Sequence, residues 1–503
     1  MNYCSQLVLA AAVVLLNARA FAVAVSDITP PRVIAFDLSP SNIDASTNFQ
    51  TITITARLTD DLSGLTVPEP SVPAPLSAFA SFRSPFGGNS APTLSVNLSF
   101  PGMISGNNLD LVCKGELIVP RYSHSGVWTL VSVDVTDLAG NVAHVSAADL
   151  KDLGLPFSFT VNGSDDRTPP DLVSLTLDPV TVDTSTGPQT LTVTARVRED
   201  LSGLGRLDQF GRPFYDFLRM NFASPSRAQQ VFAAPSMQRI SGDDHDGIYQ
   251  TTLRVPQYSE PGTWNMGFLS VSDAVGNTQS ILLGSAGAKG FTTTFTVTGP
   301  GDITPPTLLS FVIFPRRIDT STNGQTITSI VRITDNLSGL FASSGSTSFI
   351  GGVSGTFQSP SRKQSASIRI NPLFSETGSA LDLVLTNEVL FPQFSETGVW
   401  TLAGLNIRDV AGNQAILDQS ALRQLGFPTQ LAVGVAPSLA IARQGDAILL
   451  SWPAWGSDFR LESRDVGASS DWKIVGISPA TVGEQMTVSV PVLANSQFYR
   501  LSE

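Results

Sequence analysis

Acidic and amide side chains recur at matching places in three successive segments of the chain. Calcium takes six to eight oxygen ligands from carboxylates, amides and backbone carbonyls, so these residue types point to cation binding. Tight turns also require Asp and Asn beside Gly, because their side chains form Asx hydrogen bonds. Both interpretations stay open from the sequence. The three sets are Asp27, Asp60, Asp61, Asp137 and Asn141; Asp166, Glu199, Asp200, Asp273 and Asn277; and Asp302, Asp335, Asn336, Asp409 and Asn413.

Residues that could support catalysis are scarce. His124 falls where the other two segments carry Glu260 and Glu396, so no general base is repeated. The chain contains neither Gly-x-Ser-x-Gly nor His-Glu-x-x-His. The paired carboxylates at 60–61 belong to a turn that occurs three times, whereas an enzyme seldom needs three copies of one active site. We therefore expect a protein without catalytic residues.

Internal repetition organises most of the chain. An Asp-x-Thr-Pro-Pro motif opens each segment at 27–31, 166–170 and 302–306, and an Asp/Asn-Leu-Ser-Gly-Leu turn follows each time. A Gly-x-Trp motif returns after 136 residues on both occasions, at 126–128, 262–264 and 398–400. The three tryptophans precede alternating segments, which predicts that they anchor three cores.

The elements that position these residues are predicted to be strands. Apolar and polar residues alternate at 51–58, with counterparts at 191–197 and 326–333, as in half-buried strands. One short helix is expected per copy, at 146–153 and again near 419–425. Many short strands separated by turns, with almost no helix, predict an all-β protein built of β-sandwiches.

The opening motif, the Leu-Ser-Gly turn and a later Asp-x-x-Gly-Asn turn resemble those of tandem immunoglobulin-like, cadherin-like repeats in bacterial secreted and surface proteins. The resemblance covers roughly residues 26–435, although each copy exceeds the ~100 residues of a typical immunoglobulin domain. We expect the excess around 82–107. The resemblance implies that the acidic turns of each copy meet at the pole facing the preceding domain. Calcium bound there would stiffen the domain junctions, as in cadherins.

The last 70 or so residues have a different pattern, with five short strands predicted between 447 and 501. They resemble a small fibronectin-type-III-like module. Trp452, Trp455, Trp472 and Tyr499 are close in sequence there. Aromatic rings of this kind either stack on sugars or fill a small core.

The resulting fold class is all-β, with three tandem immunoglobulin-like β-sandwich repeats and a small C-terminal β-sandwich. The predicted segments are a signal peptide at 1–22, repeats at 23–163, 164–300 and 301–435, and the C-terminal module at 436–503.

Export is predicted from the N-terminal segment. An apolar run of ten residues at 7–16 has the length of a signal-peptide core, and small-x-small cleavage sites follow at 18–20 and 20–22. Cleavage would remove Cys4 and leave Cys113 alone, so no intrachain disulfide is expected. No later stretch reaches the ~18 apolar residues of a membrane span. We expect an exported protein, extracellular or at the cell surface.

Composition excludes some classes of partner. The net charge of −12 at pH 7 would repel nucleic acid, and three His with two Cys are too few for repeated zinc or iron–sulfur sites. The sequence predicts a structural or adhesive spacer array, with calcium as its candidate ligand. The alternative is a carbohydrate-binding accessory protein that uses the aromatic C-terminal module. The partner is then an extracellular protein or a polysaccharide.

Overall fold

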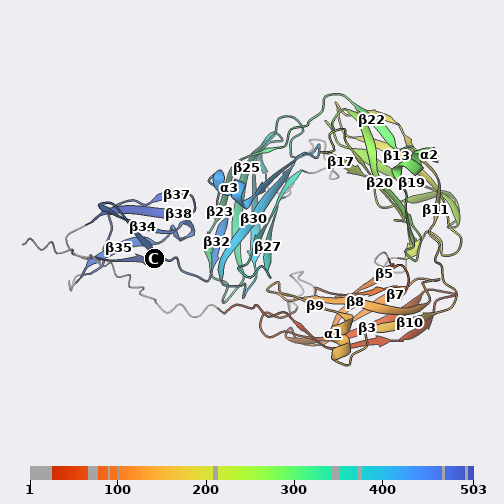
Figure 1. Cartoon of the computed structure of the whole chain (residues 1–503), viewed down its shortest axis with the longest axis horizontal. Helices are drawn as coiled ribbons and strands as arrows, with labels where there is room; N and C mark the ends of the chain where they lie inside the picture. The colour runs from red at the N-terminus through yellow and green to blue at the C-terminus, as the bar shows by residue number, and fades with distance from the viewer. Residues whose placement is uncertain are drawn as a thin grey trace, which may run out of the picture.

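The computed structural model describes residues 25–65, 77–88, 91–99, 101–207, 213–340, 351–370, 376–466, 471–492 and 497–503. The chain is nearly all β, with three similar β-sandwich units followed by a smaller fourth (Figure 1). This confirms the all-β prediction. The predicted signal peptide lies outside the described residues.

The first repeat consists of two sheets around one core. Its elements are β1 (Arg32–Ser39), β2 (Asn42–Asp44), β3 (Gln50–Thr59), β4 (Ser77–Arg83), β5 (Thr93–Asn97), β6 (Pro101–Gly106), β7 (Asp110–Val119), β8 (Gly126–Thr136), β9 (Val142–Val145), α1 (Ala147–Asp152) and β10 (Ser158–Asn162). One sheet has the order β1-β3-β7-β6. The other has the order β2-β10-β8-β4-β5, with β9 paired to β8.

The second repeat has the same topology, with an added two-stranded hairpin β14–β15. Its elements are β11 (Asp171–Asp178), β12 (Thr181–Asp183), β13 (Gln189–Arg198), β14 (Arg206–Leu207), β15 (Pro213–Phe214), β16 (Leu218–Ala223), β17 (Gln230–Phe232), β18 (Gln238–Gly242), β19 (Asp246–Val255), β20 (Gly262–Ser272), β21 (Thr278–Ser280), α2 (Leu283–Ala288) and β22 (Thr294–Thr298).

The third repeat again has a sheet ordered β23-β25-β29-β28 and a sheet ordered β24-β32-β30-β26-β27. Its elements are β23 (Thr307–Phe314), β24 (Arg317–Ile318), β25 (Gln325–Thr334), β26 (Gly352–Gln358), β27 (Ser365–Ile370), β28 (Glu376–Ser379), β29 (Asp382–Phe391), β30 (Gly398–Arg408), β31 (Gln414–Asp418), α3 (Gln419–Gln424) and β32 (Gln430–Val433).

The alternating residues face the cores as predicted. Every second residue of β3 from Ile52 to Leu58 is fully buried, while the residues that alternate with them are partly or fully exposed. Trp128 is also buried and stacks on Phe159 with an interplanar angle of 10°. The equivalent tryptophans of the other repeats are buried in the same way, which confirms their predicted role in the cores.

Two of the three short helices occur where the sequence predicts them. Ser146 caps α1 by accepting a hydrogen bond from the backbone N–H of Asp149, and Asp418 caps α3 in the same manner. The helix of the second repeat, α2, begins after Leu282 with no side-chain cap. The sequence therefore offers no capping residue that marks its start, and its Ala286 is buried in the core of the second repeat.

The C-terminal unit contains the five predicted strands and two more. Its elements are β33 (Ala440–Gln444), β34 (Ala447–Pro453), a 3₁₀ turn (Ala454–Gly456), β35 (Arg460–Asp465), β36 (Lys473–Ile474), β37 (Ala480–Val482), β38 (Gln485–Pro491) and β39 (Gln497–Ser502). They form sheets ordered β33-β34-β38-β37 and β36-β35-β39. Trp452 and Tyr499 are buried in the core between them.

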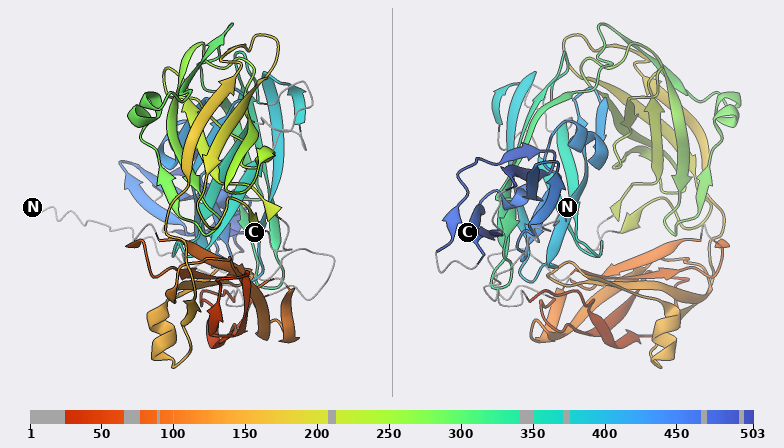
Figure 2. Two further views of the ribbon diagram at one scale, coloured as in Figure 1. Left: turned by 90° about the vertical axis from the view of Figure 1, so that its right-hand side faces the viewer. Right: turned by 60° about the vertical axis from the view of Figure 1, so that its left-hand side comes forward.

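The three repeats form a closed ring and not an extended row (Figures 1 and 2). The backbone N–H of Asp166 donates to Tyr122 of the first repeat at 2.9 Å, and Asp302 N–H donates to Tyr258 of the second at 2.7 Å. The same bond closes the ring, from Asp27 N–H to the carbonyl of Phe394 in the third repeat at 2.8 Å. Each repeat therefore contacts both of the others through equivalent surfaces.

The C-terminal unit lies outside the ring beside the third repeat (Figure 1). Glu484 accepts hydrogen bonds from Thr429 and forms an ion pair with Arg423 at 2.9 Å. Arg317 of the third repeat also forms an ion pair with Asp458 of the C-terminal unit at 3.2 Å. In the described part of the chain, no helix is long and apolar enough to cross a membrane.

Candidate functional site

The acidic residues of the first repeat converge at one end of its sandwich. Asp27 precedes β1, Asp60 follows β3, and Asp137 follows β8. The pairing of Arg32 with Thr59 brings the start of β1 beside the end of β3. One carboxylate oxygen from each of the three aspartates lies within 4.8 Å of the others. The predicted convergence is thus present in the folded chain.

The same convergence occurs in the other two repeats. In the third repeat the group is Asp302, Asp335 and Asp409, at the positions of the first. In the second repeat the group is Asp166, Glu199 and Asp200. The buried Asp273 lies close by, and the charges of Asp166 and Glu199 help to raise its pKa. We call these groups the first, second and third acidic clusters. Each lies at the contact between its own repeat and the preceding one in the ring.

Turn hydrogen bonds use part of each cluster. Asp60 Oδ2 accepts from the backbone N–H groups of Leu62 and Gly64, at 3.1 and 2.7 Å. Asp27 Oδ2 accepts from Ser63 N–H at 2.9 Å, which ties the start of the repeat to this turn. The turn chemistry expected from the sequence is therefore present. It leaves Asp60 Oδ1 buried without a hydrogen-bond partner among the described residues.

The third cluster has the same unused oxygen. Asp335 Oδ2 accepts from Leu337 and Gly339, and Asp335 Oδ1 is buried without a described hydrogen-bond partner. An acceptor deprived of water in this way is costly unless a cation or a proton occupies the site. The donor set and the unused oxygens fit an oxygen-liganded ion such as calcium.

The asparagines face the neighbouring repeat. Asn141 Nδ2 donates to Asp137 Oδ2 at 2.7 Å and to the backbone carbonyl of Asp27 at 3.2 Å. Its Oδ1 accepts from Gln364 Nε2 of the third repeat at 3.0 Å. The amide oxygen that the sequence offered as a cation ligand is therefore engaged across the junction. Asn277 and Asn413 are oriented in the same way.

Three predicted residues lie at the margin of the clusters. Asp61 is exposed, and Asn336 donates only a long 3.4 Å hydrogen bond to Thr304. Asp200 is exposed as well and accepts from Thr168 Oγ1 at 2.8 Å. Cation binding would thus depend mainly on the buried and half-buried carboxylates.

The residues that join the repeats were not predicted. Gln229 Nε2 donates to the carbonyl of Asp302 and to Asn413 Oδ1, and Gln364 makes the equivalent bonds to the first repeat. At the remaining junction His124, which occupies the position of Glu260 and Glu396, makes the contact instead, with Nε2 at 2.8 Å from Asn277 Oδ1. The signal in the sequence is a glutamine five residues after the serine of each Phe-x-Ser-Pro motif in the second and third repeats.

Burial raises the pKa of several carboxyl groups in the clusters, which favours their protonated form. Desolvation, aided by neighbouring carboxylates, raises the pKa of Asp137, Asp273 and Asp409 to about 7 each. Desolvation also raises the pKa of Glu199 to about 7 and that of Asp60 above its usual value. Among the ion pairs of the described residues, none joins Lys or Arg to a cluster carboxylate, and only His245 approaches Glu199, at 3.5 Å. Within the described part of the chain, no Lys or Arg is therefore paired with these acids.

The calcium-free protein is expected to lose stability as the pH rises from 6 to 8. The pKa of Asp137, Asp273 and Asp409 is about 7 in the folded chain and near 3.8 when unfolded. The folded chain therefore binds more protons in this range, and the stabilisation is lost as the pH passes 7. Linkage gives about 1.4 kcal/mol per carboxyl over these two pH units. Urea unfolding in chelator at pH 6, 7 and 8 measures this slope, and a flat or rising profile would contradict it.

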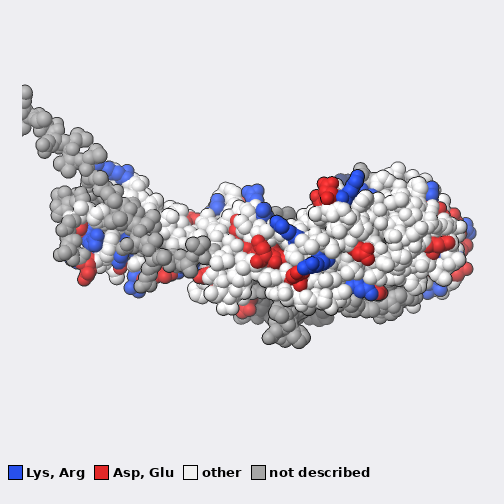
Figure 3. All heavy atoms as spheres, turned by 90° about the horizontal axis from the view of Figure 1, so that it is seen from below, with Lys and Arg blue, Asp and Glu red and all other residues white. Residues whose placement is uncertain are grey.

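Cys113 and the tryptophans of the C-terminal unit are packed against other residues and are not members of the three clusters. Cys113 is fully buried, and desolvation raises its pKa to about 11, which fits a small core residue. Trp455 is buried, and Trp472 packs against the guanidinium groups of Arg464 and Arg500. On the face shown in Figure 3, charged side chains of both signs are interspersed on a largely uncharged surface.

Comparison with protein families and with curated protein sequences found no match. Among solved structures, a marsupial T cell receptor matches 77% of this chain and 99% of its own, at 9% identity and a TM-score of 0.15. A Streptomyces avermitilis alpha-L-rhamnosidase complexed with L-rhamnose matches 94% of this chain and 55% of its own, at 10% identity and a TM-score of 0.14. Scores this low support no structural or functional argument.

Proposed function

We propose that this protein is a non-catalytic, exported scaffold of immunoglobulin-like, cadherin-like repeats, closed by a fibronectin-type-III-like module. In this proposal calcium binds the three acidic clusters and stiffens the ring, which presents adhesive or structural surfaces outside the cell. The cadherin-like resemblance of the turns and the signal-peptide pattern support the family and the location.

One observation carries the calcium proposal. Buried carboxylates recur at the same place in all three repeats, and each group adjoins another repeat. The unpartnered oxygens of Asp60 and Asp335 are acceptors that an ion would satisfy. Calcium would also supply the positive charge that the neighbouring residues lack. Because the asparagine beside each cluster bonds to the preceding repeat in the ring, an ordered cluster would hold the junction in one geometry.

The test is a calcium titration of chelator-treated protein. We expect about three calcium ions per chain in calorimetry, one for each cluster. A concentration of 100 times the dissociation constant should add about 2.7 kcal/mol per site and raise the melting temperature by several degrees. Sodium chloride of equal ionic strength is the control. Equal melting curves in calcium, sodium and chelator would assign the carboxylates to turn chemistry alone.

The carbohydrate-binding alternative gains no support from the aromatic residues of the C-terminal unit. Trp452, Trp455 and Tyr499 are all less than 5% exposed, so they fill its core. Trp472 is flanked by two arginines and has no coplanar aromatic partner among the described residues. A sugar-stacking platform requires exposed rings.

A further inference from the structure

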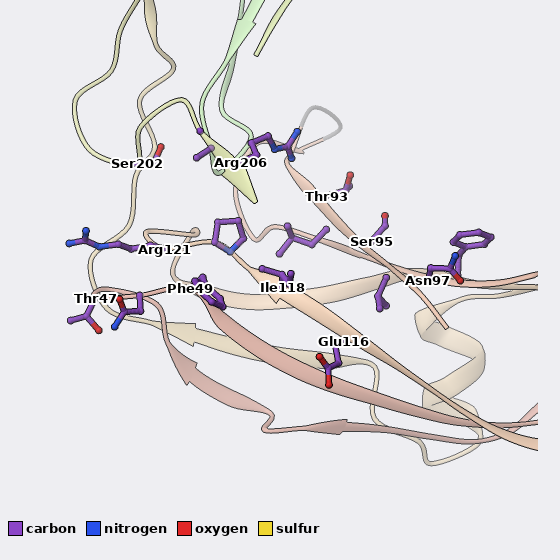
Figure 4. A pocket seen from close by; sticks show the side chains of 17 residues that line it. Thr47, Phe49, Thr93, Ser95, Asn97, Glu116, Ile118, Arg121, Ser202 and Arg206 are labelled. Atoms are coloured by element: carbon purple, nitrogen blue, oxygen red, sulfur yellow. The ribbon is translucent and has the colours of Figure 1, made fainter. Parts of the chain in front are cut away.

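A cavity of about 820 Å³ lies between the first and second repeats. Ligand sites typically measure ~300–1,000 Å³ and occur preferentially between domains. The first repeat supplies most of the wall, from the loop before β3, from β4 and β5, and from the end of β7 (Figure 4). The second repeat contributes Ser202, Gly205, Arg206 and Ala274. No carboxylate of the acidic clusters lines this cavity, so the site is independent of the calcium proposal.

The backbone of β5 is already packed inside the first repeat. β5 pairs with β4, and its last two residues lie against Gly115 of β7. A Cβ at Gly115 would be 2.8 Å from the side chain of Val96 and 2.9 Å from the carbonyl oxygen of Asn97. No further chain fits between the two strands at this point. A ligand of the cavity therefore has to be held by the side chains that line it.

Two phenylalanine rings are exposed in the cavity wall. Phe49 is 49% exposed and Phe79 is 42% exposed. The second and third repeats carry proline and glycine in place of Phe49, and arginine and serine in place of Phe79. The repeated fold therefore does not require aromatic rings at these two positions. An exposed ring offers a large apolar face on which the C–H face of a sugar can stack.

Neutral polar side chains surround these rings. Thr93, Ser95 and Asn97 alternate along β5, so all three lie on the exposed face of the strand. Asn97 is the register partner of Phe79, which places its amide beside that ring. Among the hydrogen bonds of the described residues, none uses the side chain of Asn48 or Thr93, although both line the cavity. Hydroxyl and amide groups both donate and accept, and so match the hydroxyl groups of a sugar.

The charged residues of the cavity favour an acidic sugar. Arg121 and Arg206 line it with a single carboxylate among the described residues, Glu116, although the whole chain carries a net charge of −12. Glu116 is well separated from Arg206 in Figure 4. Among the described residues Arg206 pairs with Asp216 at 3.9 Å, the limit of an ion pair. The guanidinium group of Arg206 can therefore pair with a carboxylate or sulfate group of a ligand.

We propose that this cavity binds an acidic oligosaccharide, which is a chain of sugars that carries carboxylate or sulfate groups. The rings of Phe49 and Phe79 stack on sugar faces, the polar side chains of β5 bond to hydroxyl groups, and Arg206 pairs with an acidic group. Both repeats contribute, so binding depends on the closed junction between them. This gives a chemical class to the polysaccharide partner that the sequence predicts, and it requires no calcium.

Calorimetric titration of the full chain with two acidic ligands, tetragalacturonate and a chondroitin sulfate tetrasaccharide, tests this proposal. Maltotetraose is the neutral ligand of equal length, and chelator is present throughout so that calcium cannot link the ligands to the acidic clusters. We expect at least one acidic ligand to bind at least tenfold more tightly than maltotetraose. Arg206→Gln should weaken its binding to the level of maltotetraose, whereas Phe79→Ser should weaken both. Bound ligand should also slow hydrogen exchange at residues 93–97 of the parent protein.

Arg219→Gln and Phe232→Ser are the matched controls, because both residues are exposed on the second repeat and neither lines the cavity. They should leave binding unchanged. The proposal is overturned if neither acidic ligand binds, or if Arg219→Gln weakens binding as much as Arg206→Gln, which would indicate general attraction to positive charge. It is also overturned if hexaglutamate competes with equal affinity, which would make the cavity a site for acidic peptides.

Discussion

Asp60→Asn is expected to raise the melting temperature of the calcium-free protein and to abolish calcium binding at the first cluster. An asparagine Oδ1 in the position of Asp60 Oδ2 would still accept from Leu62 and Gly64. Its Nδ2 would replace the unpartnered oxygen and donate to the carboxylates of Asp27 and Asp137, removing one buried negative charge. The same change removes a calcium ligand. Thermal melts in chelator and in calcium, with calorimetric stoichiometry, measure both effects.

This substitution is diagnostic because it should stabilise the calcium-free protein and, at the same time, weaken the stabilisation by calcium. Stoichiometry should fall from about three ions to two, and the stabilisation by calcium should fall by about 2.7 kcal/mol at 100 times the dissociation constant. Asp61→Asn is the control, since Asp61 is the adjacent aspartate, exposed, and loses the same charge. Asp335→Asn should reproduce the result in the third repeat. If Asp60→Asn changed the melting temperature equally in calcium and chelator, the first cluster would not be a calcium site.

Gln364→Ala is expected to open the ring between the third and first repeats. Gln364 donates to the carbonyl of Asp27 and to Asn141, and accepts from the N–H of Glu396. Only the bonds to Asp27 and Asn141 cross the contact, and the loss of these two at about 0.5–1.5 kcal/mol each removes roughly 1–3 kcal/mol from it. No short linker holds these two repeats together, so their separation is not opposed by the chain. Small-angle scattering should show a larger radius of gyration for the variant.

Gln229→Ala is the matched control for ring opening. It removes the same bonds at the junction of the second and third repeats. There the chain passes directly from Thr298 to Thr307, which keeps the two repeats at a high effective concentration. This variant should retain the compact scattering profile. Equal profiles for Gln364→Ala and the parent protein in chelator would show that other contacts close the ring.

Much of the fold could be predicted from local pattern. Alternation at 51–58 identified β3 because side-chain parity along a strand determines which residues are buried. Gly-x-Trp marked the three core tryptophans, since a large apolar side chain at a repeated position must be buried repeatedly. One short helix was expected in each repeat, but the position of α2 was not predicted, and no capping side chain marks its start.

The candidate site was predicted in its residue types and only partly in its geometry. Asp27, Asp60 and Asp137 meet as expected, because the strand ends that carry them meet at one pole. The direction of Asn141 was beyond prediction, since its amide oxygen bonds to Gln364, 223 residues away. The raised pKa of Asp137 likewise depends on burial in the folded protein, which no local pattern in the sequence specifies.

The sequence by itself determined the all-β class, the three repeats, their cores and the recurrence of acidic turns, because each depends on parity, spacing or residue type within a short stretch. The tertiary structure alone decided that the repeats close into a ring. Ring closure depends on the angle between successive sandwiches, which contacts such as Asp27 with Phe394 establish between residues hundreds of positions apart. Local patterning carries no information about such angles, since the same alternating strands bury the same cores whichever way the sandwiches are joined.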